Sequence, residues 1–291
     1  MRPERKYIRM PVRTILFNNS GQGFSLVELA IVLVVVALLL GGLLVPLTMQ
    51  IEQQKIRETQ KSMEEIKEAL IGYAIVNNRL PCPDSDLDGL ENPPTPTVAP
   101  NTPVAGQTTQ TFFCLVDEGG LPYQTLGVSR EDGWNNRFHY RVTPAFTQRT
   151  VIIDSTTGNV LSSTAFTLST PGNIKVLGRG DDPATSSTVE FKSSLTLASN
   201  VPLVIISYGK NGYGATSSSG QAQAPVPASN ADETTNAGTT VAFKITRSPA
   251  SFQADCSDTA ENKPFCEFDD LVTWLSPNIL FNRMVAAGRL P

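Results

Sequence analysis

The longest apolar stretch of the chain runs from Leu29 to Leu47, where none of the 19 side chains is polar. At about 1.5 Å per residue such a helix is roughly 28 Å long, which is close to the thickness of a bilayer core. A buried core helix is the alternative interpretation, but core helices seldom avoid polar residues over this length. The pattern therefore predicts a transmembrane helix over residues 24–49.

A different periodicity follows, in which apolar residues recur at steps of three and four. This spacing predicts an amphipathic helix over residues 50–80, with Thr59 completing its apolar stripe. Two asparagines followed by Pro81 are expected to end the helix. The apolar members of the stripe are Ile56, Met63, Ile66, Leu70 and Tyr73. We expect the stripe to form the spine of a folded head that comprises residues 81–291.

The head alternates short apolar runs with turn residues, which is typical of strands joined by loops. Two stretches rich in Pro, Ser, Thr and Ala, Glu91–Gln110 and Ala215–Thr240, are interpreted as surface loops. Strands are expected at Phe138–Val142, Thr150–Ile153, Asn173–Leu177, Leu203–Ser207 and Val241–Thr246. A C-terminal helix that bends at Pro277 is expected around Leu271, Trp274, Leu275, Leu280, Phe281 and Met284. The predicted fold class is α+β, a long N-terminal helix on a mainly antiparallel β-sheet with large loops.

The charges beside the apolar run predict how the chain is oriented. The first 23 residues carry five basic side chains against a single acid, Glu4. Positive charge beside a first span stays in the cytoplasm, so the N-terminus is expected there and the head across the membrane. The basic side chains are those of Arg2, Arg5, Lys6, Arg9 and Arg13.

The remaining composition argues against several classes of function. The net charge is only −4, from 23 basic and 27 acidic residues, which gives no reason to expect a nucleic-acid partner. His139 is the single histidine, so a catalytic triad and a multi-histidine metal site are excluded. No serine stands in a Gly-x-Ser-x-Gly turn. Carboxylate-based chemistry is not excluded by these absences, so a tethered carboxylate-dependent hydrolase is one alternative, but we expect that the protein is not an enzyme.

Residues 21–29, Gly-Gln-Gly-Phe-Ser-Leu-Val-Glu-Leu, lie between the basic segment and the apolar run. An ordinary secretory signal is cut after its apolar stretch, whereas a cut at Gly23 leaves that stretch on the mature protein. The segment resembles the prepilin leader of type IV pilins and of the pseudopilins of type II secretion. The resemblance implies that a membrane prepilin peptidase removes residues 1–23 and methylates the new amine of Phe24. It also implies a pilin-like fold, an inner-membrane location with a periplasmic or cell-surface head, and partners that include other subunits, an assembly platform and lipid.

Glu28 is the acid at the edge of the apolar run. A charge that moves toward the bilayer centre costs up to ~3 kcal/mol, and such residues generally have a partner. Cleavage frees a cationic amine at Phe24, and in a filament this amine could pair with Glu28 of a neighbouring subunit. Opposite charges about 4 Å apart attract by several kcal/mol at low effective dielectric, which desolvation partly offsets. The alternative is that Glu28 extends to the lipid headgroups.

Four further phrases resemble a group of prepilin-type proteins of proteobacteria, but no defined chemistry attaches to them. They are residues 78–84, 121–127, 209–212 and 267–272. The head is large for a main repeating subunit, so the chain is interpreted as a minor pilin or pseudopilin of a type IV pilus or type II secretion filament. The alternative is a membrane-anchored periplasmic binding or adhesion domain that does not polymerise.

The four cysteines form an even number, which fits disulfides in an oxidising compartment. Three pairings are open. We favour Cys82–Cys114, which flank the first polar loop, together with Cys256–Cys266, which close a short C-terminal loop as pilins commonly do. Each disulfide is expected to contribute roughly 3 kcal/mol by restricting the unfolded chain.

Asp84, Asp86 and Asp88 alternate ahead of a glycine, as at the start of a calcium-binding loop. Alternating acids place their oxygens on one side, and the glycine permits the turn. The twelfth position of such a loop is Thr95 instead of the usual glutamate, for which Glu91 could substitute. The alternative is a solvated acidic turn. Calcium at the three aspartates is the only cofactor that the sequence suggests.

Overall fold

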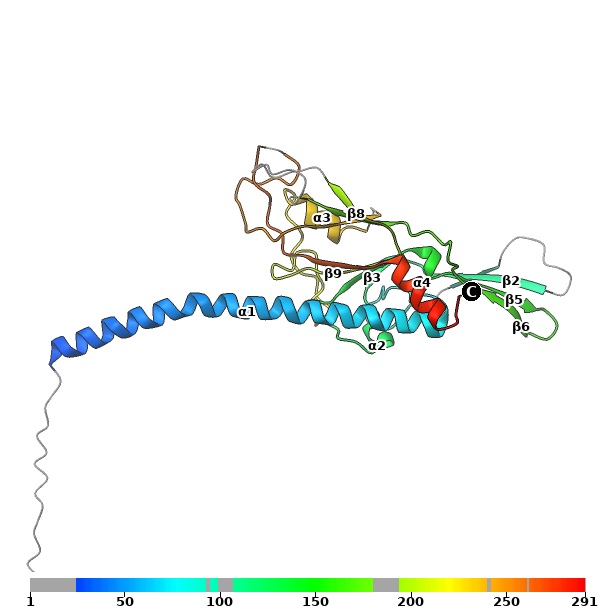
Figure 1. Cartoon of the computed structure of the whole chain (residues 1–291), viewed down its shortest axis with the longest axis horizontal. Coiled ribbons are helices and arrows are strands. Elements are labelled where there is room, and N and C mark those ends of the chain that lie inside the picture. Colours follow the sequence, from blue (N-terminus) through cyan, green and yellow to red (C-terminus); the bar gives the residue numbers. More distant parts are fainter. Residues whose placement is uncertain are drawn as a thin grey trace, which may run out of the picture. The chain divides into compact units, whose positions relative to one another are not determined.

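The computed structural model describes residues 25–92, 95–98, 107–179, 194–239, 242–260 and 262–290, without the side chains of residues 38–47, 95–98 and 164. The chain divides into two compact units, residues 1–51 and residues 52–291, and each is considered by itself. One helix, α1 (Leu26–Asn77), contributes to both units (Figure 1).

No helix among the described residues is long and apolar enough to cross a membrane. The segment predicted as a span, residues 24–49, includes Phe24 and the side chains of residues 38–47, which lie outside the described part of the chain.

Within the second unit, α1 buries one face and exposes the other. Met63, Ile66 and Leu70 are at most 2 % exposed, and Thr59 is fully buried among them. Ile56 and Tyr73 are half-buried at the edges of this stripe. The burial confirms the amphipathic helix that the spacing predicts.

The end of α1 also follows from its sequence. The helix ends at Asn77, and Asn78 takes a left-handed conformation with a φ of 55°. The backbone N–H of Asn78 still donates to the carbonyl of Ala74 at 2.8 Å. Asparagine tolerates this conformation at a helix C-terminus, and Pro81 then excludes a further helical turn.

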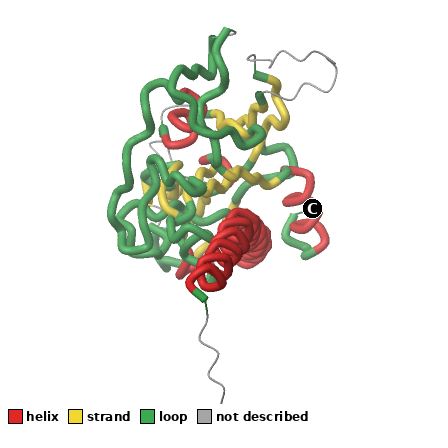
Figure 2. The backbone as a smooth tube through the Cα atoms, turned by 90° about the vertical axis from the view of Figure 1, so that its left-hand side faces the viewer, coloured by secondary structure: helices red, strands yellow, loops and turns green. Residues whose placement is uncertain are grey.

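An antiparallel sheet packs on α1 and forms the centre of the head. Its strand order is β11-β9-β4-β3. Figure 2 shows α1 end-on beside the layer of strands. All five residues of β9 are buried, because alternate side chains face two different cores: Leu203 and Ile205 join the α1 stripe, while Val204 and Ile206 face the second sheet. The strands are β3 (Glu118–Gly120), β4 (His139–Val142), β9 (Leu203–Ser207) and β11 (Leu271–Leu275).

Two further sheets complete the head. One has the order β10-β7-β8, with β10 and β7 parallel and β7 and β8 antiparallel. The other has the order β1-β2-β5-β6, is antiparallel throughout, and projects beyond the C-terminal end of α1 (Figure 1). The strands of the first are β7 (Ile174–Gly178), β8 (Leu195–Val201) and β10 (Phe243–Thr246). Those of the second are β1 (Thr95–Val98), β2 (Gln107–Phe113), β5 (Arg149–Asp154) and β6 (Val160–Thr164).

Short helices lie at the edges of the head. They are α2 (Tyr123–Leu126), the 3₁₀ turn η1 (Pro144–Phe146), α3 (Ala231–Ala237) and α4 (Pro277–Ala286). The side chain of Arg283 on α4 pairs with Glu68 of α1 at 3.1 Å. The fold class is thus α+β, as predicted, and the five predicted strands correspond to β4, β5, β7, β9 and β10.

Three predicted segments are wrong. Residues 271–275 form strand β11 and not a helix, because they pair antiparallel with β9, with Trp274 opposite Val204. The helix expected there begins only at Pro277. The stretch Glu91–Gln110, expected to be a surface loop, contains β1 and the start of β2. The stretch Ala215–Thr240, also expected to be a surface loop, contains α3, whose Asp232, Glu233 and Asn236 are fully buried.

We predict that Leu70→Ala lowers the free energy of unfolding of the head by about 2–5 kcal/mol, because it leaves a cavity under the central sheet. Val76→Ala on the same helix is the control, since Val76 is 69 % exposed. Its effect should stay within about 0.5 kcal/mol. Urea denaturation followed by circular dichroism measures both, and equal losses would contradict the assignment of the buried face.

Candidate functional site

The first turns of α1 present an acid and an uninterrupted apolar surface. Glu28 lies in the first turn, where a negative charge interacts favourably with the helix dipole. The hydroxyl of Ser25 accepts the N–H of Val27 at 3.3 Å, and its carbonyl accepts that of Leu29 at 3.0 Å. The exposed apolar side chains of this turn and the next two are Leu26, Val27, Leu29, Ile31, Val32, Leu33, Val34, Val35 and Val36. A surface of this kind indicates contact with lipid or with another protein.

The acidic loop after α1 is built around Asp84. This side chain is 2 % exposed, and its two oxygens accept the backbone N–H groups of Leu87 at 2.7 Å and Gly89 at 2.8 Å. Burial raises the pKa of Asp84. Asp86 and Asp88 are exposed, yet each contributes a carboxylate oxygen that lies within 4.8 Å of the others. The three aspartates therefore converge as the spacing predicts, but Asp84 already serves the backbone of its own loop.

Glu91 does not take part in this loop. Its carboxylate pairs with Arg79, accepts the hydroxyl of Tyr73, and accepts the backbone N–H of Cys82 at 2.9 Å. Both of its oxygens are thus engaged beside the C-terminal end of α1, and Glu91 does not replace the missing ligand at Thr95. The side chain of Thr95 lies outside the described residues.

A second group of carboxylates, the C-terminal acidic cluster, consists of Glu233, Asp269 and Asp270. Their carboxylate oxygens lie within 4.8 Å of one another. Glu233 is fully buried, Asp270 is 5 % exposed, and Asp269 is half-buried. Among the described residues, none of the three forms an ion pair with Lys or Arg.

The sequence positions Glu233 by a local signal. Asn230 caps α3 by accepting the N–H of Glu233, and its own amide donates to the Glu233 carboxylate at 2.8 Å. The arrangement differs from a standard capping box, because Glu233 accepts the side-chain amide of Asn230, whereas the backbone N–H of Asn230 donates to the carbonyl of Pro227. Asn211 holds the other side, because its amide donates to Glu233 at 2.9 Å and its backbone N–H donates to Asp269 at 2.8 Å.

Hydrogen bonds satisfy only part of the cluster. Asp270 Oδ2 accepts the amide of Asn236 at 2.8 Å, but among the described residues Oδ1 of Asp270 and Oδ1 of Asp269 are buried without a hydrogen-bond partner. Burial raises the pKa of Glu233 to about 7 and that of Asp269 to about 6. Burial, together with the charge of Glu233, raises the pKa of Asp270 well above its usual range. Three carboxylates in this arrangement offer hard oxygen ligands to a divalent cation.

A second group of buried charges, around Lys244 and Glu118, differs from the C-terminal acidic cluster because it contains both acids and bases. Lys244 on β10 is fully buried, contacts Glu118 of β3, and donates to the carbonyls of Asn236 at 3.0 Å and Gly238 at 2.8 Å. Glu118 also pairs with His139 at 2.8 Å and with Arg141. Burial alone would raise the pKa of Glu118, but His139 and Lys244 outweigh burial and lower it. This group has its counter-charges, whereas no Lys or Arg in the described part of the chain forms an ion pair with the C-terminal acidic cluster.

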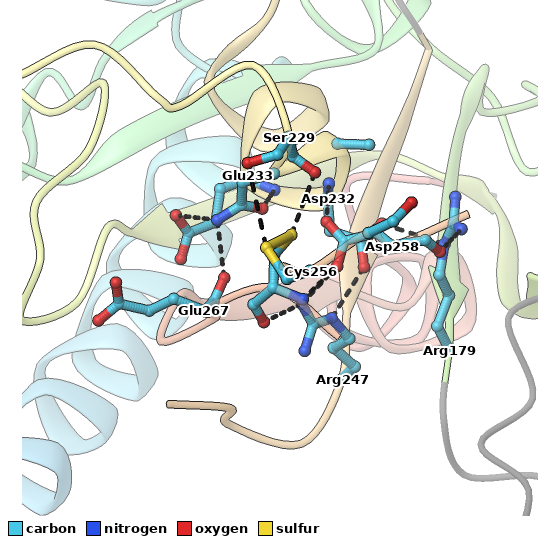
Figure 3. A network of polar contacts seen from close by, with 12 residues as sticks. Arg179, Ser229, Asp232, Glu233, Arg247, Cys256, Asp258 and Glu267 are labelled. Atoms are coloured by element: carbon cyan, nitrogen blue, oxygen red, sulfur yellow. Dashed lines mark hydrogen bonds and ion pairs between the residues drawn. A yellow bond between two sulfur atoms is a disulfide. The ribbon is translucent and has the colours of Figure 1, made fainter. Parts of the chain in front are cut away.

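Arg247 joins the first turn of α3, which carries Glu233, to the loop that the Cys256–Cys266 disulfide closes (Figure 3). Its guanidinium donates to Asp232 at 2.8 Å, to Asp258 at 3.1 Å and to the carbonyl of Cys266 at 3.0 Å. It also lies 4.6 Å and 4.5 Å from the ring centroids of Phe265 and Phe268.

The prokaryotic N-terminal methylation motif matches residues 18–44 of the chain. The match covers Gly23, Phe24 and Glu28 together with the first turns of α1. The chain carries the type IV pilin and pseudopilin signature. This signature implies a membrane-anchored pilin that a prepilin peptidase processes and that assembles with other pilin subunits. No curated protein and no solved structure matches the chain.

The pilin signature covers the predicted processing residues, and the structure covers the predicted disulfides and the acidic loop after α1. Gly23 and Phe24 lie outside the described residues, so only the sequence match covers them. The structure contains the two favoured disulfides, Cys82–Cys114 with Cα atoms 5.4 Å apart and Cys256–Cys266 with Cα atoms 4.8 Å apart. Calcium at Asp84, Asp86 and Asp88 stays a prediction.

Sequence reasoning missed the C-terminal acidic cluster. Its residues come from two places in the chain that are 36 positions apart, Glu233 and the pair Asp269-Asp270, so no spacing motif reveals them. Two of the phrases that resemble prepilin-type proteins, residues 209–212 and 267–272, nevertheless meet at this cluster. Gly209 has a φ of 57°, and a side chain there would collide with the carbonyl and carboxylate of Asp269. The resemblance of these phrases, together with the spacing of Asn230 and Glu233, is thus a signal that could have pointed to the site.

We predict that Arg247→Met lowers the free energy of unfolding by about 3–5 kcal/mol, because it leaves Asp258 buried without its counter-charge and leaves Asp232 with Arg179 as its remaining partner. Arg130→Met is the matched control, since Arg130 is exposed and lies 3.7 Å from Glu131. A surface pair of this kind contributes roughly 0–1 kcal/mol. Urea denaturation compares the two variants, and similar small effects would show that Arg247 is not structural.

Proposed function

We propose that the chain is a minor pilin or pseudopilin subunit of a type IV pilus or a type II secretion filament. It is cleaved after Gly23 and assembles through its N-terminal helix. The observation that supports this most is the pilin signature over residues 18–44, which coincides with a helix whose apolar side chains are exposed from Leu26 to Val36. Such a helix has an unpartnered surface that packing against copies in a filament would bury.

In this proposal residues 1–23 are the leader, 24–49 cross the inner membrane, 50–80 support the head, and 81–291 are the head in the periplasm or in a surface filament. The partners are the prepilin peptidase, other subunits, the inner-membrane assembly platform and membrane lipid. The role is structural and not enzymatic.

The electrostatic step of assembly involves Glu28. Cleavage gives Phe24 a cationic amine, and Glu28 of the adjacent subunit is the acid that neutralises it within a dry helix bundle. Removal of either charge leaves the other unpaired in an apolar environment, which is costlier than the loss of the attraction itself. Processing is therefore a precondition for polymerisation.

We predict that the protein recovered from cells begins at an N-methylated Phe24. Mass spectrometry of the N-terminal peptide from the membrane fraction measures this directly, with Gly23→Ala as the variant expected to retain residues 1–23. A wild-type chain that still begins at Met1 would overturn the polymer proposal and would favour the non-polymerising anchor.

We predict that Glu28→Ala reduces the amount of subunit in sheared filaments by about tenfold or more, since ~1.4 kcal/mol already changes an equilibrium tenfold. Membrane insertion should persist. Glu58→Ala, which removes an exposed acid from the same helix, is the control and should assemble normally. Normal amounts of the Glu28→Ala subunit in filaments would rule out the proposed pairing.

A further inference from the structure

A cavity of about 440 Å³ lies where the C-terminal end of α1, the strands β5 and β6, and the segment after α4 meet. Its volume falls within the range of about 300–1,000 Å³ that is typical of small-molecule sites. Phe166 and Met284 line it and are at most 4 % exposed, so the cavity has an apolar floor. Figure 1 shows α4, β5 and β6 together at this end of the head.

Two arginines give the cavity its charge. Arg149 and Arg289 line it, and none of the lining residues that the structure describes is acidic. Neither arginine forms an ion pair within the described part of the chain. Arg283 on α4, by contrast, does not line the cavity and already pairs with Glu68 at 3.1 Å. The cavity is therefore cationic, although the net charge of the chain is −4.

The turn after α4 fixes the backbone of Arg289. Gly288 has a φ of 67°, and its N–H donates to the carbonyl of Val285 at 2.9 Å. The N–H of Arg289 donates to the carbonyl of Met284, also at 2.9 Å. These two bonds and the left-handed glycine form a Schellman motif, which ends a helix and redirects the chain. Leu290 then packs against the main core, so Arg289 is anchored on both sides at the cavity.

Strand pairing and a side-chain hydrogen bond orient Arg149. The residue begins β5, where it lies opposite Phe112 of β2. Its Nε donates to the hydroxyl of Ser163 on β6 at 2.9 Å. Among the described residues, the two terminal nitrogens of this guanidinium have no partner. A guanidinium in this state is able to bind a carboxylate through two parallel hydrogen bonds.

We propose that this cavity binds a small organic carboxylate with an apolar body. The guanidinium groups of Arg149 and Arg289 hold the carboxylate, as arginines do wherever planar anions are recognised. The apolar body packs against Phe166 and Met284, where it is removed from water. The proposal goes beyond the filament role and does not depend on it.

The charged and the apolar parts of the lining together select the class of ligand. Arginines bind phosphate as well as carboxylate, so charge alone would also admit inorganic phosphate. An inorganic anion, however, leaves the apolar floor in contact with water, whereas an organic acid covers it. An uncharged apolar ligand leaves the two cations without compensation. Only a ligand with both parts satisfies the whole lining.

The first experiment measures the binding of 3-phenylpropionate to the full chain in detergent micelles by ligand-observed NMR. We expect saturable binding. The uncharged analogue 3-phenylpropanamide and inorganic phosphate should each bind about tenfold more weakly or less, because each lacks one of the two parts. Micelles without protein give the baseline for partition of the probes into detergent.

The second experiment repeats the titration with arginine variants. Arg149→Gln and Arg289→Gln should each weaken the binding of 3-phenylpropionate about tenfold, since each removes charge-assisted hydrogen bonds. Arg283→Gln is the matched control, because it removes the same charge from an arginine of α4 that does not line the cavity. All three arginines are exposed, so we expect folded variants with unchanged melting temperatures.

A third variant tests the apolar part of the cavity. Ala165 lines the cavity and is half-buried, so the larger side chain in Ala165→Leu takes up space that the apolar body needs. We expect the variant to bind 3-phenylpropionate about tenfold more weakly and inorganic phosphate as the wild-type chain does.

Three results would overturn the proposal. The first is a wild-type chain that shows no saturable binding of 3-phenylpropionate. The second is an affinity that Arg149→Gln, Arg289→Gln and Ala165→Leu leave unchanged, or that Arg283→Gln lowers as much as they do, which indicates binding elsewhere or a general effect of charge. The third is phosphate or the amide binding as tightly as the acid. None of these measurements involves filaments, so their failure is distinct from failure of the assembly proposal.

Discussion

The fold depends on one helix that has to satisfy two different surroundings. In its first turns α1 exposes apolar side chains on every side, from Leu26 to Val36, whereas from Glu52 on it buries a single stripe. A helix can make this change without cost to its backbone, because its hydrogen bonds are internal. The head therefore packs on one face of the helix. Strand β9 lies between the core that contains the α1 stripe and the second core. The two parts of α1 therefore have different roles. Its first turns present an apolar surface for association, and its second half supports the folding of the head.

The head buries two groups of charged residues, the group around Lys244 and Glu118 and the C-terminal acidic cluster, and they differ in how their charges are compensated. Around Lys244 and Glu118 each charge has a counter-charge, and the group joins β10 and the end of α3 to β3. Such pairs add little net stability compared with apolar residues, but loss of one partner is costly, so they fix one arrangement of the sheets. The C-terminal acidic cluster differs, because two of its buried oxygens lack a donor among the described residues. Buried polar groups without a partner are typical of strained or functional sites.

The sequence could predict the elements that local residue spacing determines. It could not predict those that depend on pairing between distant segments of the chain. The α1 stripe and β9 follow from spacing and from flanking turn residues. Leu271, Trp274 and Leu275 have helical spacing, yet pairing with β9 makes them a strand, because that contact joins segments far apart in the chain. The segment that contains α3 looked like a polar loop, although Asn230 and Glu233 carry a capping signal that composition obscured. The cluster of Glu233, Asp269 and Asp270 arises only when these mispredicted elements come together.

The proposed topology also bears on when the C-terminal part of the head is completed. Disulfides persist in oxidising compartments outside the cytoplasm, so the Cys256–Cys266 loop would close only after the head has crossed the membrane. That loop contains Asp258, whose carboxylate accepts the backbone N–H of Asp232 in the first turn of α3. Closure of the loop and placement of α3 would therefore both follow export, so that a subunit reaches the filament with its head complete.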